Sequence, residues 1–315
     1  MKISLHVGLH KTGTSYLQKL FFENSSYLES QGVLYPATPG HAHHKFAACF
    51  KNGNLSQAAE IFDQFVNEAR CKNLDRMLIS SEVFSEIGTA KDVYDALYGY
   101  DVEILLYLRE PVGLFLSAYN QLVREPSVRR SKPINDGNIY NLDYLSHFNR
   151  WRDAFPKSNI WVFNYDVEKS KPAGILGAFC ERLGVRSDGF RDSSVADGGV
   201  NKSIGVLGTE VLRQLNQFKC DNQTFEKAID ELSRNKFLDD SLPPSSLLKE
   251  DRIKYLIDVY LPILNHVLEE GGQDLLSEAY LEKKYLEDHR FVENLANLSM
   301  QYFMCLLFSI IPNKR

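Results

Sequence analysis

The chain has 315 residues, of which 44% are hydrophobic and 24% are charged, and its formal net charge is −5. This composition is typical of a globular protein with a large apolar core. Because the balance is acidic, the protein as a whole has no attraction for nucleic acid or an anionic membrane surface. We therefore expect no nucleic acid partner, and any anion-binding site must be local.

The five cysteines are scattered along the sequence, and no two of them form a C-x-x-C pair. This usage predicts free thiols in a reducing compartment, here the cytoplasm. The N-terminus lacks a signal-peptide pattern, and no apolar stretch reaches the roughly 18 residues of a membrane-spanning helix. For the most apolar segment, Tyr302–Ile311, two interpretations are open: a helix packed on the core, or a peripheral contact with a membrane surface or a partner. The sequence predicts no oligomeric state.

Short apolar strands alternate with helical patterns over the first two hundred residues. Strands are expected at Ile3–Val7, Met77–Ser80, Glu103–Leu108 and Asn159–Asn164, and Gly32–Pro36 is expected to be a short extended piece that ends at proline. Apolar residues recur with a helical period in Thr14–Ser30, Ser56–Cys71, Val112–Arg124, Leu142–Phe155 and Pro172–Leu183. This alternation predicts an α/β, P-loop-like fold of three αβα layers, with helices on both faces of a central, mainly parallel sheet.

The last third of the sequence is different, because it shows helical periods and no strand pattern. The expected helices are Ser203–Phe218, Thr224–Asn235 and Asp251–Glu270. We therefore predict an α/β nucleotide-binding core over residues 1–200. Residues 201–315 are expected to form a C-terminal helical extension packed on that core, within a single domain.

The first strand runs directly into a glycine loop, Gly8-Leu-His-Lys-Thr-Gly13-Thr-Ser. The two glycines have the spacing of a P-loop, but Thr14 stands where the P-loop lysine belongs and Lys11 lies inside the loop. Backbone N–H groups from Lys11 to Ser15 and the start of the next helix would attract an anion. Thr12, Thr14 and Ser15 add hydroxyl donors, and the simpler alternative is a capped strand-to-helix turn.

Two other strands also end in residues suited to chemistry. Glu82 follows the strand Met77–Ser80, and Arg109 follows Glu103–Leu108, with Ser117 eight residues further on. Ligands of parallel sheets bind at the carboxyl ends of the strands. A carboxylate there could take a proton from a hydroxyl, and an arginine fork suits phosphate. Ordinary surface roles, a helix-start carboxylate and an ion pair, are the alternatives.

Together these motifs resemble those of sulfotransferases. The sequence Lys11-Thr-Gly-Thr-Ser15, with the lysine before the glycine, is similar to their 5′-phosphosulfate loop. Arg109-Glu-Pro followed by Ser117 is similar to their 3′-phosphate motif. Ser81-Glu82 resembles the glutamate base of the carbohydrate-type members, whereas the cytosolic small-molecule type has a histidine there. The resemblance covers roughly residues 1–200.

The resemblance implies that the donor is 3′-phosphoadenosine 5′-phosphosulfate, which requires no metal. Lys11 would stabilise the charge on the leaving group, and the loop from Thr12 to Ser15, including Gly13 and Thr14, would hold the 5′-phosphate. Arg109 and Ser117 would bind the 3′-phosphate. Glu82 would deprotonate an acceptor hydroxyl, which the glutamate base suggests is on a sugar or glycan.

The stretch His41-Ala-His43-His44 leaves several roles open. No carboxylate or cysteine accompanies the histidines at ligand spacing, so a metal site is not expected. His43 or His44 could contact the acceptor or replace Glu82 as the base, and the stretch could equally be a solvated loop that starts a helix. The basic residues Arg129 to Lys132 could line an acceptor cleft or belong to a solvated loop.

Two other classes of protein compete with a sulfotransferase. A P-loop phosphotransferase or NTPase would need a carboxylate for Mg²⁺ and the lysine that Thr14 replaces. A noncatalytic nucleotide-binding homologue would have kept the loop and lost the reaction, which the joint presence of Lys11, Glu82, Arg109 and Ser117 argues against.

Overall fold

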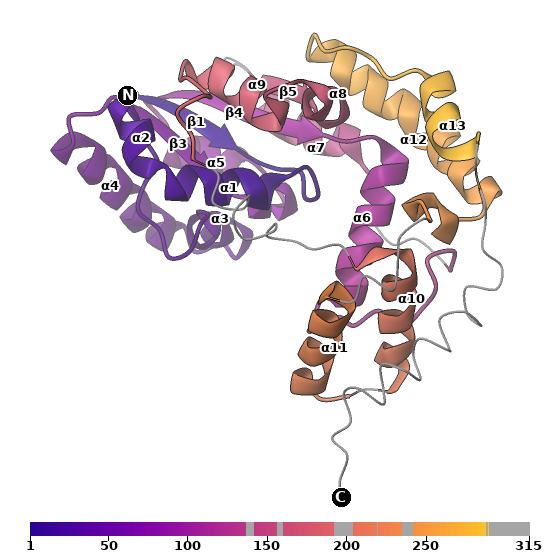
Figure 1. Ribbon diagram of the computed structural model, residues 1–315. Coiled ribbons are helices and arrows are strands. Elements are labelled where there is room, and N and C mark those ends of the chain that lie inside the picture. The colour runs from indigo at the N-terminus through magenta and orange to yellow at the C-terminus, as the bar shows by residue number, and fades with distance from the viewer. Residues whose placement is uncertain are drawn as a thin grey trace, which may run out of the picture. The chain divides into compact units, whose positions relative to one another are not determined.

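The computed structural model describes residues 1–136, 142–155, 160–191, 204–218, 220–234, 242–287 and 289 (Figure 1). The predicted boundary at residue 200 and the segment Tyr302–Ile311 lie outside these residues. No helix in the described part of the chain is long and apolar enough to cross a membrane.

Five strands form one sheet in which every described pairing is parallel, as predicted. The strands are β1 (Lys2–His6), β2 (Val33–Leu34), β3 (Arg76–Ser80), β4 (Asp101–Leu108) and β5 (Ile160–Asn164). Their order is β2-β3-β1-β4-β5, so the chain leaves β1 toward one edge and later returns to β4 on the other side. This reversal places the topological switch point, where such sheets bind ligands, at the carboxyl end of β1.

Helices cover both faces of the sheet and complete three αβα layers, as predicted. On one face, apolar side chains of α1 (Thr14–Glu23), α2 (Ser25–Ser30) and α9 (Gly174–Leu183) share a core with β3, β4 and β5. A second aromatic cluster joins α3 (His44–Lys51), α4 (Leu55–Cys71), the 3₁₀ helix η1 (Glu82–Glu86) and α7 (Tyr144–Ala154) through Phe46, Phe62, Phe84 and Trp151. The short helices α5 (Lys91–Ala96) and α8 (Tyr165–Ser170) complete this part.

The predicted helix Thr14–Ser30 is in fact two helices that meet at Asn24. The Asn24 side chain donates hydrogen bonds to the carbonyls of Leu20 and Arg191, and it accepts one from the Arg191 N–H. Asparagine side chains compete in this way with the backbone bonds of a helix. The break thereby fastens the segment after α9 to the first helix.

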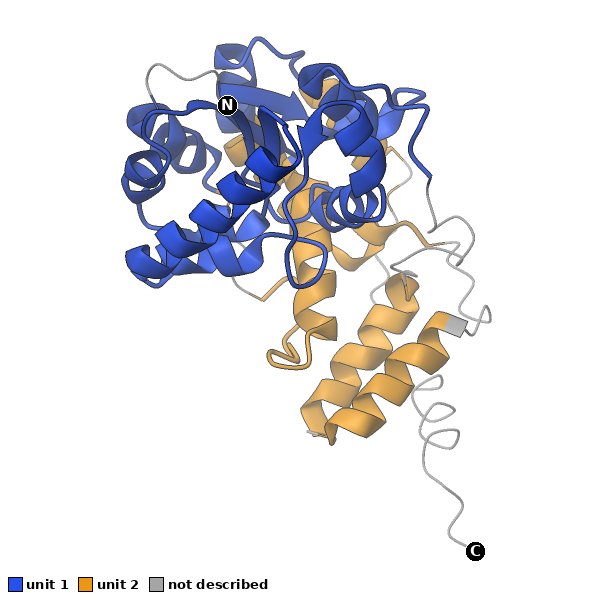
Figure 2. Cartoon of the chain, turned by 90° about the vertical axis from the view of Figure 1, so that its left-hand side faces the viewer, with its two compact units in different colours: residues 1–110, 143–197, 262–275 blue, residues 111–142, 198–261, 276–315 orange. Residues whose placement is uncertain are grey.

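The chain divides into two compact units (Figure 2). The first comprises residues 1–110, 143–197 and 262–275 and contains the sheet; the second comprises residues 111–142, 198–261 and 276–315. The second unit is helical where it is described. Its helices are α6 (Pro111–Arg124), α10 (Gly205–Leu215), α11 (Asn222–Arg234), α13 (Glu278–Leu286) and the first part of α12 (Glu250–Glu270), which continues into the first unit. The units therefore interleave along the sequence, where a single boundary was expected.

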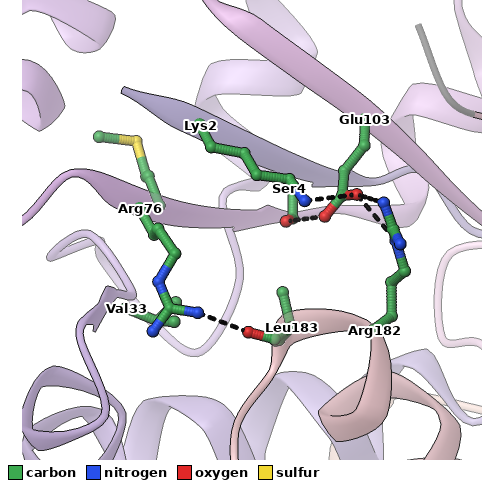
Figure 3. Close-up of a pocket in the computed structure, with 8 residues that line it drawn as sticks. Lys2, Ser4, Val33, Arg76, Glu103, Arg182 and Leu183 are labelled. Carbon is green, nitrogen blue, oxygen red and sulfur yellow. Dashed lines mark hydrogen bonds and ion pairs between the residues drawn. The ribbon is translucent and has the colours of Figure 1, made fainter.

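A buried carboxylate fastens α9 to the sheet (Figure 3). Glu103 on β4 is 1% exposed and accepts hydrogen bonds from Ser4 at 2.5 Å and from Nε of Arg182 at 2.8 Å. The Lys2 ammonium lies 3.0 Å from the same carboxylate. Arg182 also stacks on the Trp161 ring, with its guanidinium carbon 3.6 Å from the ring centroid.

Replacing Arg182 by methionine should lower the free energy of unfolding by about 3 kcal/mol, because it leaves the buried Glu103 charge with weaker compensation. Urea denaturation measures this change. Arg186→Met is the matched control, since Arg186 pairs with Asp188 on the exposed surface and such pairs contribute little. Equal effects of the two substitutions would show that the buried pair has no special weight.

Candidate active site

The glycine loop begins as a continuation of the sheet. Beyond β1, the N–H groups of Val7 and Leu9 donate to β4 carbonyls at 3.0 Å, and the Tyr107 N–H donates to the Gly8 carbonyl at 2.8 Å. The chain then turns through left-handed conformations at Lys11 (φ 67°) and Gly13 (φ 76°). The left-handed φ of Gly13 favours glycine, and a Cβ atom there would also lie 2.4 Å from Cδ1 of Ile175 and push the end of that side chain aside.

The loop delivers the chain to the start of α1. Gly13 precedes the first residue of this helix, no side chain caps it, and no acidic residue lies in its first turn. The positive end of the helix dipole therefore has no side-chain anion of its own. Ser15 is exposed and Thr14 is buried, whereas the buried Thr12 hydroxyl donates to the Leu9 carbonyl at 2.7 Å and holds the loop itself. The backbone N–H of Thr12, and not its hydroxyl, is then the group suited to the predicted phosphate contact.

Arg109, which follows β4, contacts the loop directly. Its Nη1 donates to the Lys11 carbonyl at 2.9 Å, and its guanidinium carbon lies 5.1 Å from the Tyr165 ring centroid. The structure thus places Arg109 against the backbone of Lys11, and its predicted role in binding the 3′-phosphate stays a prediction. Ser117 lies half-buried on α6, in the second unit, and its predicted role stays a prediction.

Glu82, which follows β3, lies against the start of the same loop. The Ser81 N–H donates to the His6 carbonyl at 3.1 Å and extends the pairing of β3 with β1. As a result, a Cβ atom on Gly8 would lie 3.5 Å from Cα of Glu82. The Glu82 carboxylate accepts a hydrogen bond from the Gln18 amide at 2.8 Å, and its other oxygen lies 3.8 Å from Nε2 of His44.

The two candidate histidines have different environments. His44 begins α3, its side chain is 49% exposed, and it faces Glu82. His43 is fully buried: its Nδ1 accepts from the Ser80 N–H at 3.1 Å and its Nε2 donates to the Pro36 carbonyl at 3.1 Å. Both ring nitrogens of His43 are thus used in hydrogen bonds within the core. Of these two histidines, only His44 is exposed enough to contact a substrate.

Several site residues were missed by the sequence reasoning. Gln18 contacts Glu82 from α1, one helical turn after the loop. His10, within the loop, lies 2.8 Å from Glu86 at the far end of η1, and Lys51 at the end of α3 pairs with the same carboxylate. A contact partner on another element leaves no mark in the local sequence, so no local signal could have identified these residues.

The basic stretch Arg129 to Lys132 is occupied with contacts inside the second unit. Arg129 donates to the Cys220 carbonyl and to Asn222, and it lies over the Phe225 ring. Arg130 donates to the Asp136 carbonyl at 3.0 Å. These arginines hold the loop in place, so their contacts within the second unit explain them without a role in binding an acceptor substrate.

Burial lowers the pKa of His6 and of His43 to about 4, and for His6 the nearby Glu82 charge opposes the shift. The unfolded chain binds these protons near pH 6.5, whereas the folded chain does not until about pH 4. Stability should therefore be complete above pH 6.5 and fall as the pH falls toward 4, by about 1.4 kcal/mol per pH unit for each histidine.

Urea denaturation of the wild type and of His6→Asn at several pH values measures this dependence. Asparagine can still reach Ser80, which His6 contacts through Nδ1 at 2.8 Å, but it does not titrate. The variant should show a shallower decline by about one proton. A slope unchanged by the substitution would mean that His6 is protonated in the folded protein.

No family model matches the chain, and no solved structure matches it. A protein of the archaeon Archaeoglobus fulgidus, named only "Uncharacterized protein", is 26% identical over 183 residues. This similarity covers 57% of the chain and 49% of that protein, so the chain matches about half the length of its relative. The comparison carries no information on activity.

Proposed function

We propose that the protein is a sulfotransferase that uses 3′-phosphoadenosine 5′-phosphosulfate. In the reaction, an acceptor oxygen forms a bond to sulfur, and the bond between sulfur and the bridging oxygen of the donor breaks. The acceptor hydroxyl proton goes to the Glu82 carboxylate, and adenosine 3′,5′-bisphosphate leaves with the electron pair of the broken bond. The products are a sulfate ester and the bisphosphate.

One observation carries the proposal: the residues that follow β3 and β4, far apart in sequence, both contact the glycine loop that follows β1. Arg109 reaches the carbonyl of Lys11 at 2.9 Å, and Gly8 lies against Glu82 on the other side of the loop. A cradle for phosphate, a cation inside it and a carboxylate beside it are the groups that metal-free sulfuryl transfer needs. The backbone of the loop and the start of α1 would hold the 5′-phosphate.

Each of these residues has a proposed role. Lys11, at the turn of the loop, would stabilise the negative charge that develops on the leaving bisphosphate. Arg109 would bind the 3′-phosphate, and the role predicted for Ser117 stays a prediction. Glu82, only 14% exposed, would act as the general base for the acceptor.

The proposed acceptor is hydroxyl-rich, such as a sugar or glycan, because Ser81-Glu82 resembles the base of the carbohydrate-type sulfotransferases. A polar cavity of about 550 Å³ lies beyond the end of η1, with Thr89, Ser146 and Asn149 in its wall. Arg150 lines the same cavity and donates to the Ser85 carbonyl on η1 at 2.9 Å. Glu82 does not line this cavity, which is therefore separate from the proposed base.

Thermal unfolding with two nucleotides tests the proposal. Adenosine 3′,5′-bisphosphate should raise the melting temperature clearly, because a ligand that binds only the folded state stabilises it, and ATP with Mg²⁺ should raise it little. A larger rise in melting temperature with ATP and Mg²⁺ than with the bisphosphate would refute the sulfotransferase proposal and favour a P-loop phosphotransferase or NTPase.

Adenosine 5′-phosphate, which lacks the 3′-phosphate, provides the control. In the wild type, the bisphosphate should bind more tightly than the monophosphate by about 1.5–3 kcal/mol, as for a charged hydrogen bond. In Arg109→Ala most of this difference should vanish while the monophosphate affinity is nearly retained. An unchanged difference would show that Arg109 does not bind the 3′-phosphate.

A further inference from the structure

The Glu82 carboxylate, the proposed base, lies beside a loop that contains a lysine, and its neighbours determine how it is oriented. Within the described residues, the Gln18 amide donates a hydrogen bond to one oxygen at 2.8 Å, and Nε2 of His44 lies 3.8 Å from the other, within the range of an ion pair but too far for a hydrogen bond. A lysine or arginine in these places would hold the carboxylate as an ion pair and weaken it as a base. The Gln18 amide orients it without adding a full charge.

The orientation of the His44 ring follows from Ser81. The Ser81 side chain is 0% exposed, and its oxygen accepts a hydrogen bond from the Val83 N–H at 3.2 Å. Its own hydroxyl proton needs an acceptor, because a buried unpaired donor is costly. His44 Nδ1, at 2.9 Å, supplies that acceptor. The ring then carries its proton on Nε2, the nitrogen that faces Glu82.

Gln18 ties this arrangement to the donor loop. It is 2% exposed and lies on α1, whose first residue follows Gly13 of the loop. A displacement of α1 would therefore move the base and the phosphate cradle together.

We infer that Gln18 and His44 are positioning residues of the active site. Gln18 donates to the Glu82 carboxylate, His44 presents Nε2 toward it, and Ser81 fixes the tautomer of His44. The inference rests on the proposed role of Glu82 as the base, but its structural core, the chain from Ser81 through His44 to Glu82, can be measured without turnover.

Nitrogen-15 NMR of the histidine rings tests that core. His44 should be the Nε2–H tautomer in the wild type, and it should become a mixture of tautomers in Ser81→Ala. Glu82→Gln should shift the His44 Nε2 signal and leave that of the buried His43 unchanged. If His44 carries its proton on Nδ1, or does not respond to Glu82→Gln, the inference is wrong whether or not the protein is a sulfotransferase.

Two substitutions of His44 form a matched pair for activity. The glutamine amide can occupy the place of Nε2–H, whereas the shorter asparagine reaches only the place of Nδ1. His44→Gln should thus keep kcat within about threefold, while His44→Asn and Gln18→Met should lower it about tenfold to a hundredfold, as for a misplaced reacting group. Transfer of labelled sulfate from the donor to a panel of glycans measures kcat.

Binding of adenosine 3′,5′-bisphosphate separates positioning from collapse of the site. All three variants should bind it as the wild type does, because the loop and Arg109 are intact. Equal losses of activity in His44→Gln and His44→Asn would overturn the positioning role of the ring. Loss of bisphosphate binding in both would assign His44 to the fold of the loop instead. Failure of the wild type to bind the bisphosphate would refute the proposed function and leave the NMR result standing.

Discussion

Glu82→Gln should reduce sulfuryl transfer by about 10²–10⁴-fold, the contribution of a general base. Glutamine has the shape of glutamate, and its carbonyl oxygen can still accept the hydrogen bond from Gln18. It cannot take the proton of the acceptor hydroxyl. The loop proposed to hold the donor is untouched, so the affinity for adenosine 3′,5′-bisphosphate should change by no more than about threefold. Turnover with labelled donor and calorimetric titration of the bisphosphate measure the two quantities.

Glu60→Gln is the control for this substitution, since Glu60 is an exposed residue of α4. It should change neither quantity. Retained turnover in Glu82→Gln would remove Glu82 from the reaction and direct attention to His44 as the base. Lost bisphosphate binding with turnover intact would contradict the assignment in another way, because it would make Glu82 part of the donor site.

Lys11→Met should lower turnover by about 10²–10³-fold, the loss seen when one stabiliser of a developing negative charge is removed. Methionine retains a long side chain with a Cβ atom, so the left-handed backbone at residue 11 carries the same conformational cost as in the wild type. The effect on kcat should exceed the effect on donor affinity, because the charge that Lys11 is proposed to oppose grows as the bond to sulfur breaks.

Lys169→Met provides the comparison, as Lys169 is a second lysine near the site, 5.7 Å from the Tyr165 ring centroid. Its loss should affect binding through net charge alone and leave kcat near the wild-type value. Lys11→Arg should recover part of the lost turnover. If Lys11→Met weakens donor binding and leaves kcat unchanged, the lysine binds the ground state and has no special role in the reaction.

The sequence predicted the sheet well because both faces of it are buried. Runs such as Ile104 to Leu108 are apolar throughout, and this pattern is typical of parallel strands between two helical layers. The same pattern predicted that Glu82 and Arg109 lie at the carboxyl edge of the sheet, since each comes within two residues of the end of a strand. The convergence of these residues on the glycine loop therefore required only the strand order, which the structure supplied.

The parts that could not be predicted depend on contacts between distant segments. The break of the first helix at Asn24 is fixed by Arg191, and the fate of His43 is decided by Ser80 and Pro36. A histidine in a polar stretch has no local sign that its ring is in the core. The second unit was also beyond prediction, because residues 111–142 belong with helices that follow much later in the chain.

The helix η1 carries Glu82 at one end and Glu86 at the other, and each carboxylate is contacted from two sides. Gln18 and His10 come from the segment that includes the glycine loop, while His44 and Lys51 come from the two ends of α3. Such cross-linking makes local opening cooperative, because neither segment can separate from η1 without losing contacts at both ends. Amide hydrogens of α3 should therefore exchange more slowly when adenosine 3′,5′-bisphosphate is added, if the nucleotide binds the loop as proposed.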